Sequence, residues 1–333
     1  MSEPANAAPT AWLISDGAAG NARQCQALAR AMGLDDATGY IVQLPPPWRW
    51  FAPRLTRGAA YAFRPALAPP WPDIAIGCGR QAALLTRVLR QYSGGRTFTV
   101  QILDPRVDPA LFDAVVAPQH DRLTGANVLG MLGAVHGIDT ALLLQATTDF
   151  YTLRHLPQPR TALLVGGPRR GLGLDAAWLD GFVARLETLL SGQGGSLMVT
   201  TSRRTPPAWR ARLHGAFSSG CVHFWDGPQD GPNPYLGYLA YADRIVVTPD
   251  SVNMLSEACA VGVPVLSSLP PGASGKIAAF HTALKTAYQL HELGVDTDSL
   301  QRALPLRETP AIATALWERY RARISGVPAV DAG

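Results

Sequence analysis

The stretch DRIVVTPDSVNMLSEACAVGVPVL, residues 243–266, carries the pattern that decides the fold. An apolar run at 244–247 ends in the polar sequence TPDS, and a second apolar run begins at 263. Residues 251–260 between the two runs have helical spacing, with Asp250 or Ser251 in the position of an N-cap. A strand, a helix and a strand in this order predict two neighbouring parallel strands joined by a crossover helix.

The predicted helix contains a single acidic residue, Glu257, about two turns after its start. Helical geometry places Glu257 near the edge of the inward apolar stripe. A carboxylate there can accept two hydroxyl hydrogen bonds in a fork, which is how a ribose diol is held. The alternative is an ordinary exposed acid on a helix surface, and the residues alone do not separate these two interpretations.

The same alternation of strands and helices continues along the whole chain. Near-continuous apolar strands between amphipathic helices indicate parallel sheets that are covered on both faces. We therefore predict two doubly wound α/β domains. The predicted strands are 11–14, 40–43, 73–76, 97–102 and 114–116, then 161–165, 196–200, 221–225, 244–247 and 263–267, and the helices include 23–32, 80–91, 176–190, 235–241 and 251–260.

The predicted domain boundary lies in residues 147–160, which contain two prolines and little apolar periodicity. The expected domains are 1–150 and 151–310, and helical residues 276–292 are expected to finish the second one. The last segment, 311–333, is expected to form a helix that returns to the first domain. Residues 45–72 are rich in Pro, Trp and Arg and predict an irregular excursion. That excursion either contacts an acceptor or a membrane, or is a connecting loop packed by its own tryptophans.

Composition places the chain among globular proteins, with 47% hydrophobic and 16% charged residues in a length of 333. No apolar run reaches the roughly 18–20 residues of a membrane span, and the N-terminus lacks the pattern of a secretory signal. The expected location is the cytoplasm, with peripheral contact to the inner membrane as an option. The four cysteines are too dispersed for a zinc site or a disulfide framework, and no metal site is expected.

The net charge of +4 fits phosphate-bearing small molecules, nucleic acid or an anionic membrane surface. Nucleic acid is not expected as a partner, because the arginines are dispersed and no recognition helix or RNA-binding motif occurs.

In open parallel sheets, ligands bind beyond the carboxyl ends of the strands. After the first predicted strand, LISDGAAGNARQ (13–24) supplies Gly17 and Gly20, which let the backbone approach a ligand closely before a helix begins. The alternative is a tight turn in which Asp16 and Asn21 are caps. Gln24 lies on the helix that follows.

Two further strand ends in the first half are polar. IAIGCGRQAALL (74–85) again places glycine amides at the start of a helix. In residues 100–121, Gln101 and His120 fall at two successive strand ends. A histidine that follows a strand and precedes Asp121 is a candidate general base, and a loop cap is the equal alternative.

The second half opens with LLVGGPRRGLGLD (163–175), in which Gly166 and Gly167 precede two arginines. Backbone N–H groups and guanidinium groups in this arrangement can surround a phosphate. VTTSRRTPP (199–207) adds hydroxyl groups and Arg204 directly after the next strand. Both motifs fall on the same edge of the predicted second sheet, which predicts an anion site there.

The second half resembles the nucleotide-sugar-binding domain of GT-B glycosyltransferases, such as the enzyme that adds N-acetylglucosamine in peptidoglycan synthesis. That resemblance rests on Gly166-Gly167, on TTSRR (200–204) and on TPDSVNMLSEACAVGVPVL (248–266). The whole chain more closely resembles the mitochondrial-fission "elongated mitochondria" family, whose bacterial members resemble GT-B enzymes. The shared phrases include DGAAGNARQ, GCGRQAA, FDAVVAPQHD and NPYLGYLAYADRIVVTPDSVNMLSEA, and they run in order from residue 13 to about 266.

The resemblance implies two doubly wound Rossmann-like domains that face each other across a cleft, as in the GT-B fold. It implies that Glu257 holds the ribose of a nucleoside-diphosphate sugar, and that the diphosphate meets the amides and side chains of a second-domain donor site comprising Gly166, Gly167, Arg204, Asp250 and Ser251. The loop 16–21 would shape the acceptor side, with Gly17, Gly20, Asn21, Gln24 and Gln101 as substrate-binding residues.

The chain departs from the peptidoglycan enzyme at Asn21, where that enzyme has a histidine. Because an amide cannot act as a base, Asp16 or His120 would have to take that role, or the chain binds without turnover. The sequence offers no convincing Asp-x-Asp pair of the kind that metal-dependent sugar transferases use.

The function expected from the resemblance is therefore metal-independent transfer from a nucleoside-diphosphate sugar to a lipid or cell-envelope acceptor, without a cofactor. Two alternatives remain. One is a sugar-nucleotide epimerase of the same fold, and the other is a non-catalytic scaffold that recruits a partner to a membrane.

Overall fold

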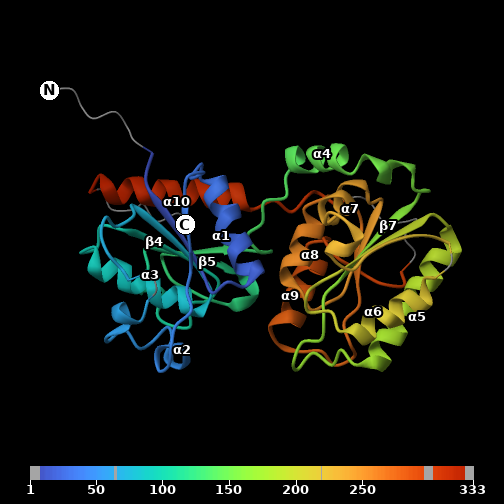
Figure 1. Ribbon diagram of the computed structural model, residues 1–333, viewed down its shortest axis with the longest axis horizontal. Helices are drawn as coiled ribbons and strands as arrows, with labels where there is room; N and C mark the ends of the chain where they lie inside the picture. Colours follow the sequence, from blue (N-terminus) through green and yellow to red (C-terminus); the bar gives the residue numbers. More distant parts are fainter. Residues whose placement is uncertain (1–7, 64–65, 219, 296–302, 327–333) are drawn as a thin grey trace. The chain divides into compact units, whose positions relative to one another are not determined.

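The computed structural model describes residues 8–63, 66–218, 220–295 and 303–326, and its contacts divide the chain into two compact units (Figure 1). The first unit comprises residues 1–137 and 308–333, and the second comprises 138–307. The first seven residues, on which the signal-sequence argument rests, and residues 327–333 of the expected C-terminal segment lie outside the described residues.

The first unit contains a parallel sheet, as predicted, and this sheet has six strands in the order β2-β1-β3-β4-β5-β6. One strand was not predicted, because β6 is short and partly exposed and the glycine-bearing sequence before it indicates only a turn. The strands are β1 (Ala11–Ser15), β2 (Thr38–Ile41), β3 (Ile74–Cys78), β4 (Phe98–Ile102), β5 (Ala114–Pro118) and β6 (Val128–Met131).

Helices cover both faces of this sheet, and the alternation of side chains along β3 shows how. Ile74 and Ile76 pack with α1 (Ala19–Ala31) and α10 (Thr309–Ile324), whereas Ala75 packs with α3 (Arg80–Tyr92). Successive residues of a strand point to opposite faces of the sheet. Two separate apolar layers therefore enclose the sheet, and both consist almost entirely of fully buried side chains.

The C-terminal helix α10 belongs to the first unit, although it follows the whole second unit in sequence. Glu308 accepts hydrogen bonds from the backbone N–H groups of Leu132 and Gly133 at 2.8 and 2.9 Å, and Trp317 Nε1 donates to the Met32 carbonyl at 2.9 Å. Arg323 pairs with Asp113 at 2.5 Å. Arg323 is therefore a structural residue of the first unit.

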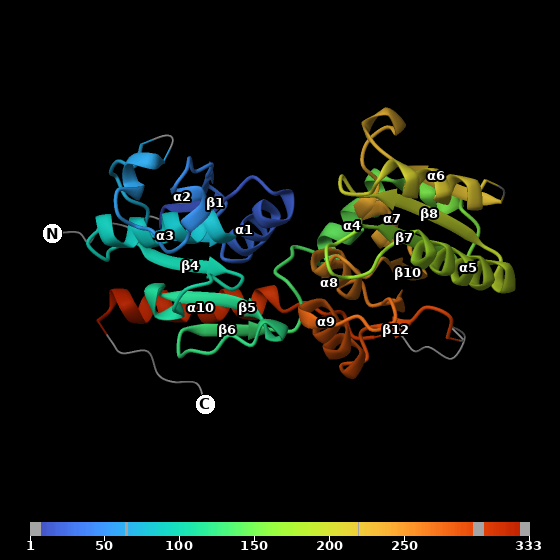
Figure 2. The same ribbon diagram turned by 90° about the horizontal axis from the view of Figure 1, so that it is seen from below.

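The second unit contains another six-stranded parallel sheet, in the order β12-β11-β10-β7-β8-β9 (Figure 2). Helices α5 and α6 pack on one face of it, and α8 packs against β10 and β11. Its elements are β7 (Arg160–Val165), α5 (Ala176–Gln193), β8 (Ser196–Thr201), α6 (Pro207–Ala216), β9 (Cys221–Trp225), α7 (Tyr235–Tyr241), β10 (Arg244–Val247), α8 (Val252–Cys259), β11 (Val265–Ser267), α9 (Gly275–Thr286) and β12 (His291–Glu292).

The boundary between the units lies earlier than the expected residue 150. Residues that were expected to form a linker instead contain α4 (Thr140–Asp149) and the short helix η4 (Tyr151–His155). The Tyr241 hydroxyl on α7 donates to the Thr147 carbonyl at 2.8 Å, and the Phe150 ring lies so close to Gly237 that a Cβ there would be 2.7 Å away. These contacts place α4 in the second unit.

Two other predicted segments differ from the structure. The helix expected over 276–292 ends at Thr286, because the backbone reverses at Tyr288 (φ 55°) and continues into β12. The excursion at 45–72 is not wholly irregular, since it contains the short helices α2 (Trp48–Phe51) and η1 (Ala59–Ala62).

Candidate functional site

The topology of the second sheet singles out one place on its carboxyl edge. The chain runs from β7 outward through β8 to β9, and then returns to place β10 on the other side of β7. Connections that diverge from neighbouring strands leave a crevice at such a switch point, where α/β proteins bind ligands. Gly166 and Gly167 follow β7, and Thr248 to Ser251 follow β10, so the fold brings these two sequence motifs together.

Asp250 is the centre of this site. Its carboxylate is fully buried and accepts hydrogen bonds from the Gly167 N–H at 3.1 Å, the Arg204 guanidinium at 2.7 Å and the Thr248 hydroxyl at 2.8 Å. Thr248 Oγ1 in turn accepts from the Gly166 N–H at 2.7 Å. Because these contacts are internal, Asp250 holds the two loops and Arg204 in place. In this structure its carboxylate does not face outward, where a sugar-nucleotide donor would be contacted directly.

The two glycines are required by close packing. A Cβ atom at Gly166 would lie 2.2 Å from Asp250 Oδ1, and one at Gly167 would lie 2.3 Å from the Arg204 carbonyl oxygen. Any side chain at either position would have to displace the loop after β8 or the Asp250 carboxylate. The sequence motif therefore reflects contact between protein loops, in addition to any approach of a phosphate.

Three groups at this switch point favour an anion. Arg204 keeps 52% of its side chain exposed while it pairs with Asp250, and the exposed Arg169 donates to the Asp250 carbonyl at 3.3 Å. Ser251 caps α8 by accepting from the Met254 N–H at 3.3 Å. The N-terminus of a helix carries partial positive charge, and two guanidinium groups add to it. The arrangement can bind a phosphate or diphosphate.

Glu257 is not an ordinary exposed helix acid. It is partly buried, and Tyr235 O–H donates to Glu257 Oε2 at 2.5 Å. Tyr235 is the first residue of α7, so its hydroxyl orients the acid from a neighbouring helix. Sequence reasoning did not select Tyr235, because the contact joins two helices that are 22 residues apart in the chain.

His281 lies behind the same loop. It is only 1% exposed, its Nε2 lies 3.0 Å from the Pro249 carbonyl oxygen, and burial lowers its pKa from the ordinary 6.5 to about 4. The neutral imidazole therefore donates Nε2–H to that carbonyl and supports the segment that leads into Asp250.

Lowering the pH from 7 to 5 is expected to reduce the free energy of unfolding through His281 by about 2 kcal/mol. In this range the unfolded histidine takes up a proton and the folded one does not, so the unfolded state binds more protons and gains stability as the pH falls. Urea unfolding of the wild type and of His281→Gln at both pH values measures the effect. An equal pH dependence in the two proteins would contradict this assignment.

A second constellation lies near the ends of β8 and β9. His214 Nε2 and Asp226 Oδ2 are 2.5 Å apart, Thr201 donates to Asp226 Oδ1 at 3.0 Å, and the His214 ring stacks on Phe224 with centroids 4.0 Å apart. An oriented histidine of this kind can take up and release protons. The sequence contains no local signal for it, because the three polar residues come from different elements.

The first sheet has its own switch point between β1 and β3. Asp16 follows β1, and its Oδ1 accepts from Asn21 Nδ2 at 2.9 Å and from the Ala18 N–H at 3.1 Å. A Cβ at Gly79, which follows β3, would lie 2.7 Å from Asn21 Nδ2. The structure thus brings Asp16 and Asn21 together as an oriented pair beside the glycine turn. Gly17 adopts φ 81° in the loop after Asp16, and Gly20 lies in the first turn of α1.

The other expected residues of the first unit lie elsewhere. The side chains of Gln24 and Gln101 are buried, with 3% and 0% exposure, and Gln101 Nε2 donates to the Ile102 carbonyl at 2.9 Å. Packing inside the unit encloses both side chains, so neither faces outward in this structure, and their role in substrate binding stays a prediction. His120 lies in η3 (Gln119–Asp121) after β5. Three strand spacings separate β1 from β5, about 14 Å, so Asp16 and His120 do not form one pair.

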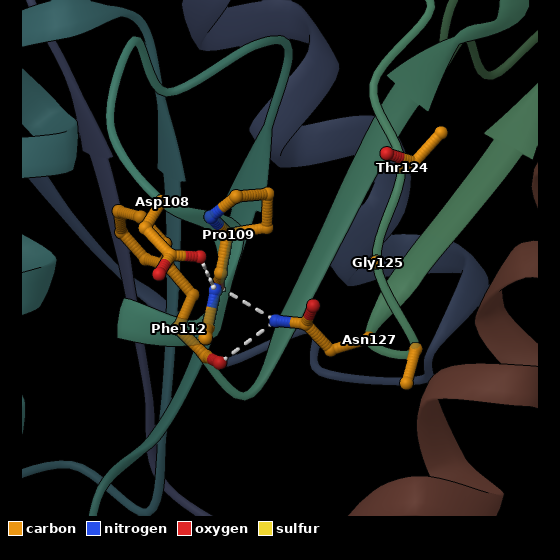
Figure 3. A pocket seen from close by; sticks show the side chains of 8 residues that line it. Asp108, Pro109, Phe112, Thr124, Gly125 and Asn127 are labelled. Carbon is orange, nitrogen blue, oxygen red and sulfur yellow. Dashed lines mark hydrogen bonds between the residues drawn. The ribbon is translucent and has the colours of Figure 1, made fainter.

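The first unit also has a pocket of about 290 Å³ that lies away from its switch point (Figure 3). Asp108, Pro109 and Phe112 line one side and Thr124 to Asn127 the other, and Asn127 Nδ2 donates to the carbonyls of Pro109 and Phe112 at 2.7 and 2.9 Å. These segments precede β5 and β6, so the pocket lies at the amino ends of the strands. Ligand sites of open α/β sheets lie at the opposite edge.

Across residues 8–63, 66–218, 220–295 and 303–326, no three His, Cys, Asp or Glu side chains gather in a way that could hold a metal ion. Within the same residues, none of the helices combines the length and the apolar character needed to cross a membrane.

Comparison with solved structures defines the class of fold. A candidate UDP-N-acetylglucosamine 2-epimerase from Listeria monocytogenes has a TM-score of 0.60 at 12% identity, with 97% of this chain and 98% of that chain covered. The S. aureus MnaA–UDP structure has a TM-score of 0.56 at 11% identity, with 98% and 100% covered. At such low identity the likeness concerns the fold, and that fold is GT-B-like, with two doubly wound parallel sheets.

The chain belongs to the mitochondrial fission ELM1 family, whose model matches residues 19–320. It is 30% identical over 289 residues to the mitochondrial fission protein ELM1 of Arabidopsis thaliana, a match that covers 76% of this chain and 65% of that protein's length. It is 26% identical over 298 residues to an uncharacterized protein of Rickettsia prowazekii, with 78% and 83% of the two chains covered. The resemblance that the sequence motifs indicated is thereby confirmed.

Proposed function

We propose that the second unit binds a nucleoside-diphosphate sugar and that the protein is a metal-independent glycosyltransferase. The observation that carries the proposal is the buried Asp250 carboxylate, which ties Gly167 and Arg204 together beside the N-terminus of α8. An internal acid that fixes a half-exposed arginine at a topological switch point is a preorganised anion site. Two solved proteins of similar fold support this proposal: S. aureus MnaA is bound to UDP, and a UDP-GlcNAc 2-epimerase from Neisseria meningitidis is bound to UDP-GlcNAc.

In the proposed mechanism the donor's diphosphate lies against Arg204, Arg169 and the first turn of α8. These groups neutralise the negative charge that develops on the leaving diphosphate, and they do so without reorganisation because Asp250 already orients Arg204. Glu257, oriented by Tyr235, accepts hydrogen bonds from the ribose diol about two turns along the same helix.

We assign the general base to Asp16 rather than His120. Asp16 lies at the switch point of the first sheet, and the Asn21 amide fixes the orientation of its carboxylate, as a general base for an acceptor hydroxyl requires. We propose a lipid or another cell-envelope component as the acceptor. Asp16→Asn keeps the size of this side chain but replaces the carboxylate, which can accept a proton, with an amide, which cannot. The substitution therefore tests the role of Asp16 as a base.

Glu257→Ala is expected to weaken sugar-nucleotide binding at least tenfold, because one charged hydrogen-bonding group to the ribose is lost. Isothermal titration calorimetry with UDP-, GDP-, ADP- and CMP-sugars measures it, first with the wild type to find the donor. Glu187→Ala removes an exposed acid from α5 and is the matched control. Unchanged affinity in Glu257→Ala would remove the ribose assignment.

Product analysis with a sugar nucleotide labelled in the sugar distinguishes the chemistries. Transfer moves the label to an acceptor, whereas epimerisation returns it as an isomer of the donor. If none of the sugar nucleotides binds the wild type, the proposed function fails and a non-catalytic scaffold replaces it.

A further inference from the structure

The segment 37–72 of the first unit has an unusual composition that the proposed function does not use. Its 36 residues contain no Asp or Glu, and they include four arginines and seven aromatic residues. Such a segment carries only positive charge, and its aromatic content exceeds what a surface connection requires. The structure shows how these side chains are distributed.

One set of aromatic residues anchors the segment. Phe63 is buried, and Trp48 and Trp71 pack against the same apolar layer as α3. Trp48 Nε1 also donates to the Arg57 carbonyl at 3.1 Å. Arg80, at the start of α3, donates to the carbonyls of Arg49 and Trp50 at 3.0 and 3.4 Å and so holds helix α2. The segment is therefore a fixed part of the unit.

The other set of aromatic residues faces solvent. Trp50, Phe51 and Tyr61 are 66%, 58% and 81% exposed. Large aromatic side chains are among the most costly to leave in water, and adjacent exposed ones mark an interaction surface. Trp50 and Phe51 occupy consecutive positions of α2, and the anchored partner Trp48 precedes them.

Exposed arginines accompany these rings. Arg49, Arg54 and Arg57 are exposed, and none of the ion pairs among the described residues includes them. We call the group Arg49, Trp50, Phe51, Arg54 and Arg57 the basic-aromatic surface. Its positive charge has no compensating acid within the segment.

We propose that the basic-aromatic surface docks on the surface of an anionic phospholipid bilayer. Tryptophan and phenylalanine rings partition to the boundary between headgroups and acyl chains, and arginines bind the phosphates above it. Anionic lipids attract basic residues that lie within a Debye length of the membrane surface. This inference does not rest on the proposed function, since membrane docking requires neither a sugar nucleotide nor catalysis. The surface nevertheless adjoins the first switch point, because Arg80, which holds α2, directly follows Gly79.

A bilayer fits the observations better than a nucleic acid or a protein partner. Proteins that bind single-stranded nucleic acid stack successive bases on aromatic side chains along an extended basic groove, whereas Trp50 and Phe51 are adjacent residues on the single turn of α2. A protein partner would supply acids to match three arginines in fixed geometry, whereas a lipid surface supplies mobile phosphates wherever the arginines lie.

The test is co-sedimentation of the full-length protein with phosphatidylcholine vesicles that contain or lack phosphatidylglycerol, at low and at physiological ionic strength. The wild type is expected to bind only the anionic vesicles, and more weakly as salt screens the charges. Trp50→Ser combined with Phe51→Ser is expected to reduce binding about tenfold, and Arg49→Gln combined with Arg57→Gln by a similar factor.

Matched controls remove equivalent groups elsewhere. Tyr288→Ser combined with Leu304→Ser removes two side chains that are 80% and 84% exposed, and Arg23→Gln combined with Arg30→Gln removes two exposed arginines of α1. Both control variants are expected to bind anionic vesicles like the wild type. Thermal unfolding of every variant shows that the fold is retained, because all the replaced side chains lie mainly in solvent.

Three results would overturn the proposal. The first is a wild type that does not sediment with anionic vesicles, and the second is an aromatic variant that sediments as well as the wild type. The third is binding of a labelled single-stranded oligonucleotide that the same variants abolish while vesicles do not bind, which would assign the surface to nucleic acid.

Discussion

Replacing Asp250 by alanine is expected to lower the free energy of unfolding by about 3 kcal/mol. The substitution leaves the Gly167 N–H and the Thr248 hydroxyl without their buried acceptor, and it removes the partner of Arg204. The cost is set mainly by the two buried donors, because Arg204 is half exposed and can be hydrated again. Urea unfolding followed by circular dichroism gives the value.

Asp180→Ala is the control for this prediction, because Asp180 and Arg212 form an aspartate–arginine pair of similar length, 2.6 Å, with side chains that are 60% and 39% exposed. Exposed pairs contribute from zero to about 1 kcal/mol. If Asp250→Ala costs no more than Asp180→Ala, then burial does not give the Asp250 network its strength. The organising role that we assign to Asp250 would then be wrong.

Gly167→Ala is expected to destabilise the protein by about 3 kcal/mol and to abolish sugar-nucleotide binding. The added methyl group would meet the backbone carbonyl oxygen of Arg204 at 2.3 Å, and a backbone atom cannot rotate away as a side chain can. Relief requires the loop after β8 to shift, which moves the Arg204 guanidinium away from Asp250. Unfolding and titration calorimetry on the same preparation measure both effects.

The matched substitution is Gly192→Ala in α5, where an added Cβ has no neighbour within 4 Å. Alanine in a helix is favoured over glycine by about 0.8–1 kcal/mol, so this control is expected to be neutral or stabilising. If Gly167→Ala has the same free energy of unfolding as Gly192→Ala, then the loop after β8 shifts to accept the methyl group without loss of stability. In that case the close contact would not explain the glycine at position 167.

Much of the candidate site could be predicted from local sequence. Gly166-Gly167 and Thr248 to Ser251 each follow an apolar strand, and parallel strands bring their carboxyl ends to one edge. What could not be predicted is which side chains face inward. Asp250, Gln24 and Gln101 were expected to meet ligands, and all three are buried, because polarity alone does not show whether a side chain's partners are inside the protein.

Contacts between distant elements could not be predicted from local sequence patterns either. Tyr235 with Glu257, and Thr201 with Asp226 and His214, join residues from separate elements. Helix α4 was not predicted, because its apolar residues do not form a regular stripe and Leu144 is 68% exposed. It is stabilised by packing on α7, a contact that tertiary structure alone supplies.

The sequence by itself determined the class of fold, since apolar strands alternating with helices can be buried only as parallel sheets covered on both faces. It also determined the family, because the motifs occur in order along the chain. Only the tertiary structure decided that Asp250 organises the site from within, that α4 belongs to the second unit, and that Trp50 and Phe51 face solvent while Trp48 does not. Burial depends on what each residue packs against, and those neighbours are distant in the chain.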